Sequence, residues 1–211
     1  MKKIPKLAVK NPALQNGFGM VEILVSLIIL MVGLLGLAGL MVQGQRSEIE
    51  SYQRVQAMIL LQDMVGRINA NRNVASCYTY TNAATGLPYL GVDVTAATPP
   101  CASGSASQQQ QASDDLDSWN ALLQGSAETA GVNSAGAMAG ARGCISYDAA
   151  SELTSVTGAA IAGTGIYTVS AAWQGLGATF ANTTELCGKD LYGDERQRRV
   201  ATLTFRIASL L

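Results

Sequence analysis

The residue whose chemistry is most distinctive is Glu22, a carboxylate at the start of a long apolar segment. Residues 23–45 carry no charged side chain. An ionised Asp or Glu at the centre of a bilayer helix costs about 2.5–3.5 kcal/mol on insertion scales, so carboxylates in such segments usually serve a function. No basic residue lies close to Glu22 in the sequence. We therefore expect its positive partner to belong to another molecule.

The residues before Glu22 indicate a targeting segment that starts on the cytoplasmic side of a membrane. Residues 1–17 contain no acidic residue, and positive charge in such a segment keeps it cytoplasmic. A Sec signal peptide would require an uninterrupted apolar core followed by an A-x-A-like site, whereas Glu22 opens this core and no convincing site follows Val42. We interpret residues 1–17 as a leader and residues 18–45 as a membrane helix. The positive charges of the leader are Lys2, Lys3, Lys6 and Lys10.

The membrane helix is expected to continue well beyond the membrane. No proline occurs from residue 18 to residue 71, and a helix of this length would span about 80 Å. Its second half, residues 46–73, carries two apolar stripes on opposite sides. The first stripe consists of Ile49, Tyr52, Val55 and Ile59, and we expect it to face helices of other subunits. The second consists of Leu61, Met64, Val65 and Ile68, and we expect it to pack on the protein's own sheet. The alternative, a helix buried in one domain, accounts only for the second stripe.

Three glycines, Gly33, Gly36 and Gly39, recur every third residue in the membrane helix. Glycine allows helix backbones to approach closely in membranes. It also weakens a helix in water by about 1 kcal/mol relative to alanine. The three glycines therefore indicate either a packing face or a point where the helix loosens.

Residues 74–211 are expected to form one exported head. Within it, residues 95–142 are of low complexity, and we interpret the glutamine run 108–111 as a solvated loop. Asp114 or Asp115 is suited to N-cap a short helix. We interpret these acidic residues as a helix start rather than a calcium site, because no further ligands follow. The buried face of this helix would consist of Leu116, Trp119, Leu122 and Leu123.

Three strands are predicted in the rest of the head, at residues 143–147, 166–173 and 200–208. Alternating apolar and polar residues indicate an antiparallel sheet with one face against an apolar partner. The second stripe of the long helix can supply that partner. The sequence therefore predicts an α+β fold, in which a long N-terminal helix and a small antiparallel sheet on its C-terminal half form a ladle.

The chain contains four widely spaced cysteines, Cys77, Cys101, Cys144 and Cys187. A zinc site would need all four of these distant thiolates, because there is no histidine and no C-x-x-C motif. An even number of cysteines in an exported domain indicates two disulfides, and three pairings are possible. We favour Cys77 with Cys101, closing the loop after the long helix, and Cys144 with Cys187, joining the sheet to a late loop.

The composition argues against an enzyme or a nucleic-acid-binding protein. The lack of histidine excludes Ser-His-Asp and Cys-His catalysis. Neither a P-loop nor a G-x-G-x-x-G motif after a strand is present. The one basic cluster, residues 196–199, is too small to indicate nucleic-acid binding, and we interpret it as a solvated turn before the last strand. We expect no cofactor and no metal.

The segment 17–22, behind its lysine-rich leader, resembles the class III leader of type IV pilins. This resemblance implies that a prepilin peptidase cleaves between Gly17 and Phe18 and methylates the new amino group of Phe18. It also implies that Glu22 neutralises the N-terminal amine of a neighbouring subunit during assembly.

The second half of the chain is similar to the PilV group of minor pilins. The similarity rests on the acidic Trp helix, Gly-Cys-Ile at 143–145, the strand ending in Ala-Trp-Gln-Gly, Cys187-Gly188 and the closing Arg-Arg-Val strand. It is strongest over residues 17–73 and 143–208. It implies a subunit held in the inner membrane and then incorporated into a type IV pilus, whose filament also contains the major pilin. In the pilus it would belong to a tip priming complex with other minor pilins and a tip adhesin. The alternatives are a type II secretion pseudopilin, which shares the front end, and a stand-alone membrane-anchored binding protein.

Overall fold

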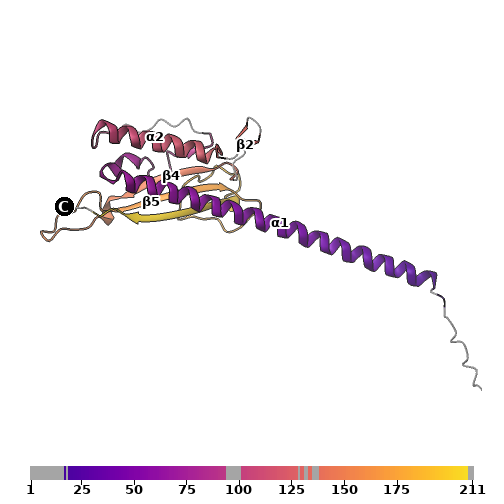
Figure 1. Cartoon of the computed structure of the whole chain (residues 1–211). Helices are drawn as coiled ribbons and strands as arrows, with labels where there is room; N and C mark the ends of the chain where they lie inside the picture. Colours follow the sequence, from indigo (N-terminus) through magenta and orange to yellow (C-terminus); the bar gives the residue numbers. More distant parts are fainter. Residues whose placement is uncertain are drawn as a thin grey trace, which may run out of the picture. The chain divides into compact units, whose positions relative to one another are not determined.

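The computed structural model describes Gly17 and residues 19–93, 101–127, 129–130, 133–134 and 138–208. The chain divides into two units, Met1–Gln45 and Arg46–Leu211. The long helix α1 (Met20–Ala70) contributes to both, and its unbroken course confirms the helix predicted from the absence of proline (Figure 1). The helix ends slightly earlier than expected, because a short 3₁₀ helix, η1 (Arg72–Tyr78), follows it. The ladle arrangement of the whole chain stays a prediction.

In the first unit, α1 is apolar and fully exposed. Every residue from 20 to 45 is solvent-exposed. Within the described residues, α1 is the one helix long and apolar enough to be a candidate membrane span, with a mean hydropathy of 2.8 over its most apolar window. An exposed apolar surface of this extent is typical of a segment that a lipid bilayer or other protein chains cover.

The second unit is built on an antiparallel sheet in the order β1-β4-β5-β6. The predicted strands are confirmed, with small changes in their ends. They are β4 (Arg142–Asp148), β5 (Ile166–Gln174) and β6 (Arg198–Arg206). The two-residue strand β1 (Leu90–Gly91) adds an edge that the sequence analysis missed.

One face of this sheet lies in the main core together with α1. Leu61, Met64 and Ile68 of the second stripe are fully buried, and they share a core cluster with Ile145 of β4 and Val169 of β5. The expectation that the second stripe packs on the protein's own sheet is therefore confirmed. The pairing of Ile145 with Val169 across the two strands keeps both side chains on the same face.

The helix α2 (Ala106–Leu123) begins well before the predicted start. Ser105 is its N-cap and forms a capping box with Gln108, whose backbone nitrogen donates to the Ser105 hydroxyl (3.4 Å) and whose side chain accepts from the Ser105 nitrogen (2.9 Å). The four consecutive glutamines are thus helical, and the expectation of a solvated loop was wrong. Neither Asp114 nor Asp115 is the N-cap.

The apolar face predicted for this helix is confirmed. Leu116, Trp119 and Leu123 are buried, and the indole nitrogen of Trp119 donates to the carbonyl oxygen of Leu60 in α1 (3.0 Å). This bond joins α2 to the C-terminal half of α1, and Figure 1 shows the ribbons of the two helices beside the sheet. The remaining described elements are β2 (Thr129–Ala130), β3 (Asn133–Ser134), η2 (Ala149–Ser151) and η3 (Glu195–Gln197).

Two disulfides hold the head, with the pairing favoured from the sequence. Cys77 bonds to Cys101 and joins η1 to the segment that leads into α2. Cys144 bonds to Cys187 and forms, with Ala172 and Tyr192, a small second core on the other face of the sheet. Among the described residues no cysteine is free.

Candidate functional site

Glu22, the carboxylate at the start of the long apolar segment, lies in the first turn of α1. Its backbone nitrogen donates to the carbonyl oxygen of Gly19 (2.9 Å), and its own carbonyl accepts from the hydroxyl of Ser26 (2.7 Å). Within the described residues the Glu22 side chain has no ion pair or hydrogen bond. It lies beside Ile23 and Leu27 in a shallow apolar groove of the first unit. A carboxylate in this setting can accept a charged donor from outside the chain.

The other predicted assembly residues are placed only in part. Gly17 is exposed, whereas Phe18 lies outside the described residues. Gly33, Gly36 and Gly39 all lie within the unbroken α1, and a methyl group added at any of them would meet no atom within 4 Å. Each of the three glycines therefore has open space beside it, and their role in packing or loosening stays a prediction.

In the second unit, the first apolar stripe of α1 is exposed. The exposed fractions of Ile49, Val55 and Ile59 are 47%, 56% and 52%, and that of Tyr52 is 52%. The two stripes of one helix therefore occupy different environments, since the second stripe is buried in the core. Exposed large apolar side chains in a row are typical of a surface that binds another protein.

Arg199 fastens the end of the sheet to α1. Its guanidinium forms an ion pair with Glu50 (Nη2–Oε1 3.0 Å) and also donates to the carbonyl oxygen of Gly177 (2.9 Å). The backbone nitrogen of Leu176 donates to the same carboxylate oxygen of Glu50 (3.2 Å). These contacts hold the loop after β5 close to the part of α1 that carries the exposed stripe.

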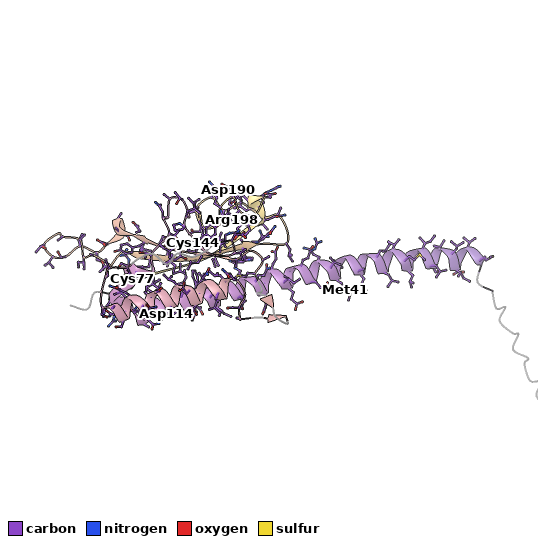
Figure 2. The ribbon with its side chains drawn as sticks, turned by 90° about the horizontal axis from the view of Figure 1, so that it is seen from above. Met41, Cys77, Asp114, Cys144, Asp190 and Arg198 are labelled. Atoms are coloured by element: carbon purple, nitrogen blue, oxygen red, sulfur yellow. A yellow bond between two sulfur atoms is a disulfide. The ribbon has the colours of Figure 1, made fainter. Side chains whose placement is uncertain are left out.

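The environment of Arg198 differs from the sequence expectation, which placed its whole basic cluster in a solvated turn. Its side chain is fully buried, and its Nε pairs with Glu195 (2.7 Å). The other nitrogens donate to three carbonyl oxygens, those of Glu185 (2.8 Å), Cys187 (3.1 Å) and Asn182 (2.6 Å). Figure 2 shows Arg198 close to Cys144 of the second disulfide. The residue therefore orders the loop that this disulfide closes.

A second buried network joins α1, η1 and α2. Asp115, which is buried, accepts from the hydroxyl of Tyr78 (2.7 Å) and from Arg67 (3.2 Å). Burial, and secondly the hydrogen bond to Asp115, raises the pKa of Tyr78, so its hydroxyl remains a proton donor at neutral pH. Arg67 also pairs with Asp63 in its own helix (2.8 Å). In each of these contacts a hydrogen-bond donor faces a carboxylate, which is typical of a network that stabilises a fold.

Glu22, which has no ion pair among the described residues, and the exposed stripe present a charge and an apolar surface that are suited to association. Within the described residues no group of three His, Cys, Asp or Glu side chains is placed to hold a metal ion. Comparison with known proteins adds nothing to this picture, because no family model, curated protein or solved structure matches the chain.

Proposed function

We propose that this chain is a minor pilin of the PilV group, which takes part in the assembly of a type IV pilus. The observation that carries the proposal is the surface of α1. Its first turn exposes the Glu22 carboxylate, its next residues are apolar and exposed up to residue 45, and exposed apolar residues recur to Ile59. A helix of this kind requires lipid first and a protein partner afterwards.

Glu22 provides the specific contact in this proposal. Cleavage between Gly17 and Phe18 by a prepilin peptidase would create a positively charged, methylated amine on each mature subunit. Two opposite charges about 4 Å apart attract by about 4 kcal/mol at an effective dielectric of about 20. A carboxylate that has no partner among the described residues of its own chain can therefore select the correct position of a neighbouring subunit as both leave the membrane.

The head provides the lateral contacts. Its two disulfides, the network around Asp115 and the bonds of Arg198 cross-link its elements. The exposed stripe on α1 belongs to the same unit and can pack against helices of other minor pilins or of the major pilin. In this proposal the assembled complex primes the pilus tip and carries a tip adhesin.

The test is the substitution Glu22→Ala, with Glu48→Ala as the matched control. Both residues are exposed on α1, and neither carboxylate has an ion pair within the described residues. We expect Glu22→Ala to leave processing of the leader intact but to lower the amount of the chain in sheared surface filaments by at least tenfold. Glu48→Ala should leave that amount unchanged.

Normal incorporation of Glu22→Ala would contradict the proposal. A processed chain that stays in the membrane fraction in both wild type and variants would favour the type II secretion pseudopilin instead. An unprocessed chain would favour the stand-alone membrane-anchored binding protein.

A further inference from the structure

A polar cleft of about 410 Å³ lies on the second unit where η1 meets the start of β5 and the end of β6. Pockets of about 300–1,000 Å³ are typical of small-molecule sites. Among the described residues that line the cleft, Arg72 is cationic and none is acidic. The hydroxyl-bearing side chains that line it are Ser76, Ser103, Thr164 and Tyr167.

Tyr167 is the most informative of these residues. Its side chain is enclosed, with an exposed fraction of 2%, and its ring lies between those of Tyr147 (4.6 Å between centroids) and Phe205 (5.5 Å). Within the described residues its hydroxyl has no hydrogen-bond partner. A methyl group added at Gly163, which also lines the cleft, would lie 3.9 Å from that oxygen. The ring is buried but the hydroxyl oxygen opens into the cleft, where it is free to bond to a ligand.

The protonation state of Tyr167 makes it a donor. Burial raises its pKa to about 12, so the hydroxyl keeps its proton at physiological pH. Thr164, by contrast, already donates to the carbonyl oxygen of Ile161 (2.6 Å) and accepts from the nitrogen of Leu153 (2.9 Å). Among the described residues, Tyr167 therefore offers the cleft a hydroxyl that has no bond within the protein and can bind a ligand.

Arg72 and two serines supply the rest of the site. Arg72 is exposed and has no ion pair or hydrogen bond within the described residues. A free guanidinium is suited to a planar carboxylate, because its donors match the two oxygens. Ser76 donates to Ser103 (3.3 Å between hydroxyl oxygens), which leaves the Ser76 oxygen as an acceptor and the Ser103 proton as a donor.

We propose that this cleft binds a sugar residue that carries a carboxylate, such as a uronic acid. The carboxylate would pair with Arg72, and the ring hydroxyls would bond to Tyr167 and to the serine pair. A simple carboxylate would use only the guanidinium, whereas a neutral sugar would leave it unpaired. The proposal does not depend on the assembly function.

The test is calorimetric titration of the full chain in detergent with D-galacturonate, and with galactose and acetate as the matched neutral sugar and simple anion. We expect saturable binding of galacturonate, with galactose and acetate at least tenfold weaker. Tyr167→Phe removes one hydroxyl and should weaken binding about fivefold, which is the usual effect of one hydrogen bond. Arg72→Gln should weaken it at least tenfold, and Arg54→Gln, at an exposed arginine of α1 outside the cleft, should not change it.

Several results would overturn the proposal. They are no binding of galacturonate by the wild type, equal binding of galacturonate and acetate, or an Arg72→Gln variant that binds like the wild type. If Tyr167→Phe does not fold, the Arg72→Gln variant still tests the proposal. Arg72 is exposed, and replacing it removes no contact within the described residues.

Discussion

Replacing Asp115 by alanine would remove the carboxylate that joins three elements of the head. The carboxylate is buried in α2 and accepts from Tyr78 (2.7 Å), Arg67 (3.2 Å) and Gln111 (3.0 Å). These partners come from η1, α1 and α2 respectively. The variant therefore tests whether the network contributes to the stability of the head.

The size of the effect follows from the burial of each partner. Tyr78 is fully buried, and losing a charged acceptor there costs about 1.5–3 kcal/mol. The Arg67 side chain is 27% exposed and would keep its ion pair with Asp63. Losing its contact with Asp115 therefore costs less than about 1 kcal/mol. Gln111 is exposed and contributes little. We expect Asp115→Ala to lower the free energy of unfolding by about 1.5–4 kcal/mol.

The assay is urea unfolding of the full chain in detergent without reductant, followed by tryptophan fluorescence, because Trp119 is buried in the same helix. The control is Asp117→Ala, which removes an exposed carboxylate two residues away and should change the free energy by less than about 0.5 kcal/mol. A loss below about 1 kcal/mol for Asp115→Ala, or equal losses for both variants, would refute the reasoning.

Two further predictions concern packing and pH. Gly143→Ala would place a methyl group 2.4 Å from the ring of Trp119 and should destabilise the head by about 1–3 kcal/mol. Gly66→Ala is the control, because a methyl group there meets open space beside α1; it should stabilise the head by up to about 1 kcal/mol. Both variants are measured in the same urea assay. Because burial raises the pKa of Tyr167 to about 12, the folded state favours the neutral phenol. The raised pKa of Tyr167 therefore makes its full contribution to the stability of the folded state below about pH 10, and this contribution is lost as the pH rises towards 12. The melting temperature should therefore fall less between pH 9 and pH 11 in Tyr167→Phe than in the wild type, and equal falls would count against this assignment.

Much of the fold could be predicted from the sequence because the relevant signals are local. The absence of proline predicts α1, alternation predicts β5 and β6, and the shift of the apolar stripe near residue 60 predicts which side of α1 is buried. Each of these patterns reflects a regular repeat of side chains along one element. They do not depend on which distant residues come together.

The errors arose where burial depends on distant partners. Arg198 has the same side chain as its exposed neighbour Arg196, and only the carbonyl groups of the folded loop make it a buried residue. Asp115 was expected at a helix start, but Tyr78 and Arg67 bring it into the core. The true start of α2 did have a local signal, the Ser105-x-x-Gln108 capping box, which the surrounding low-complexity composition obscured.

The central claim, assembly of a processed subunit into a filament, is tested most directly by mass spectrometry of the N-terminal peptide. Sheared surface filaments are compared with the membrane fraction. The account predicts a peptide in the filaments that begins at an N-methylated Phe18. A filament fraction without this peptide, or a chain that still begins at Met1, would contradict it.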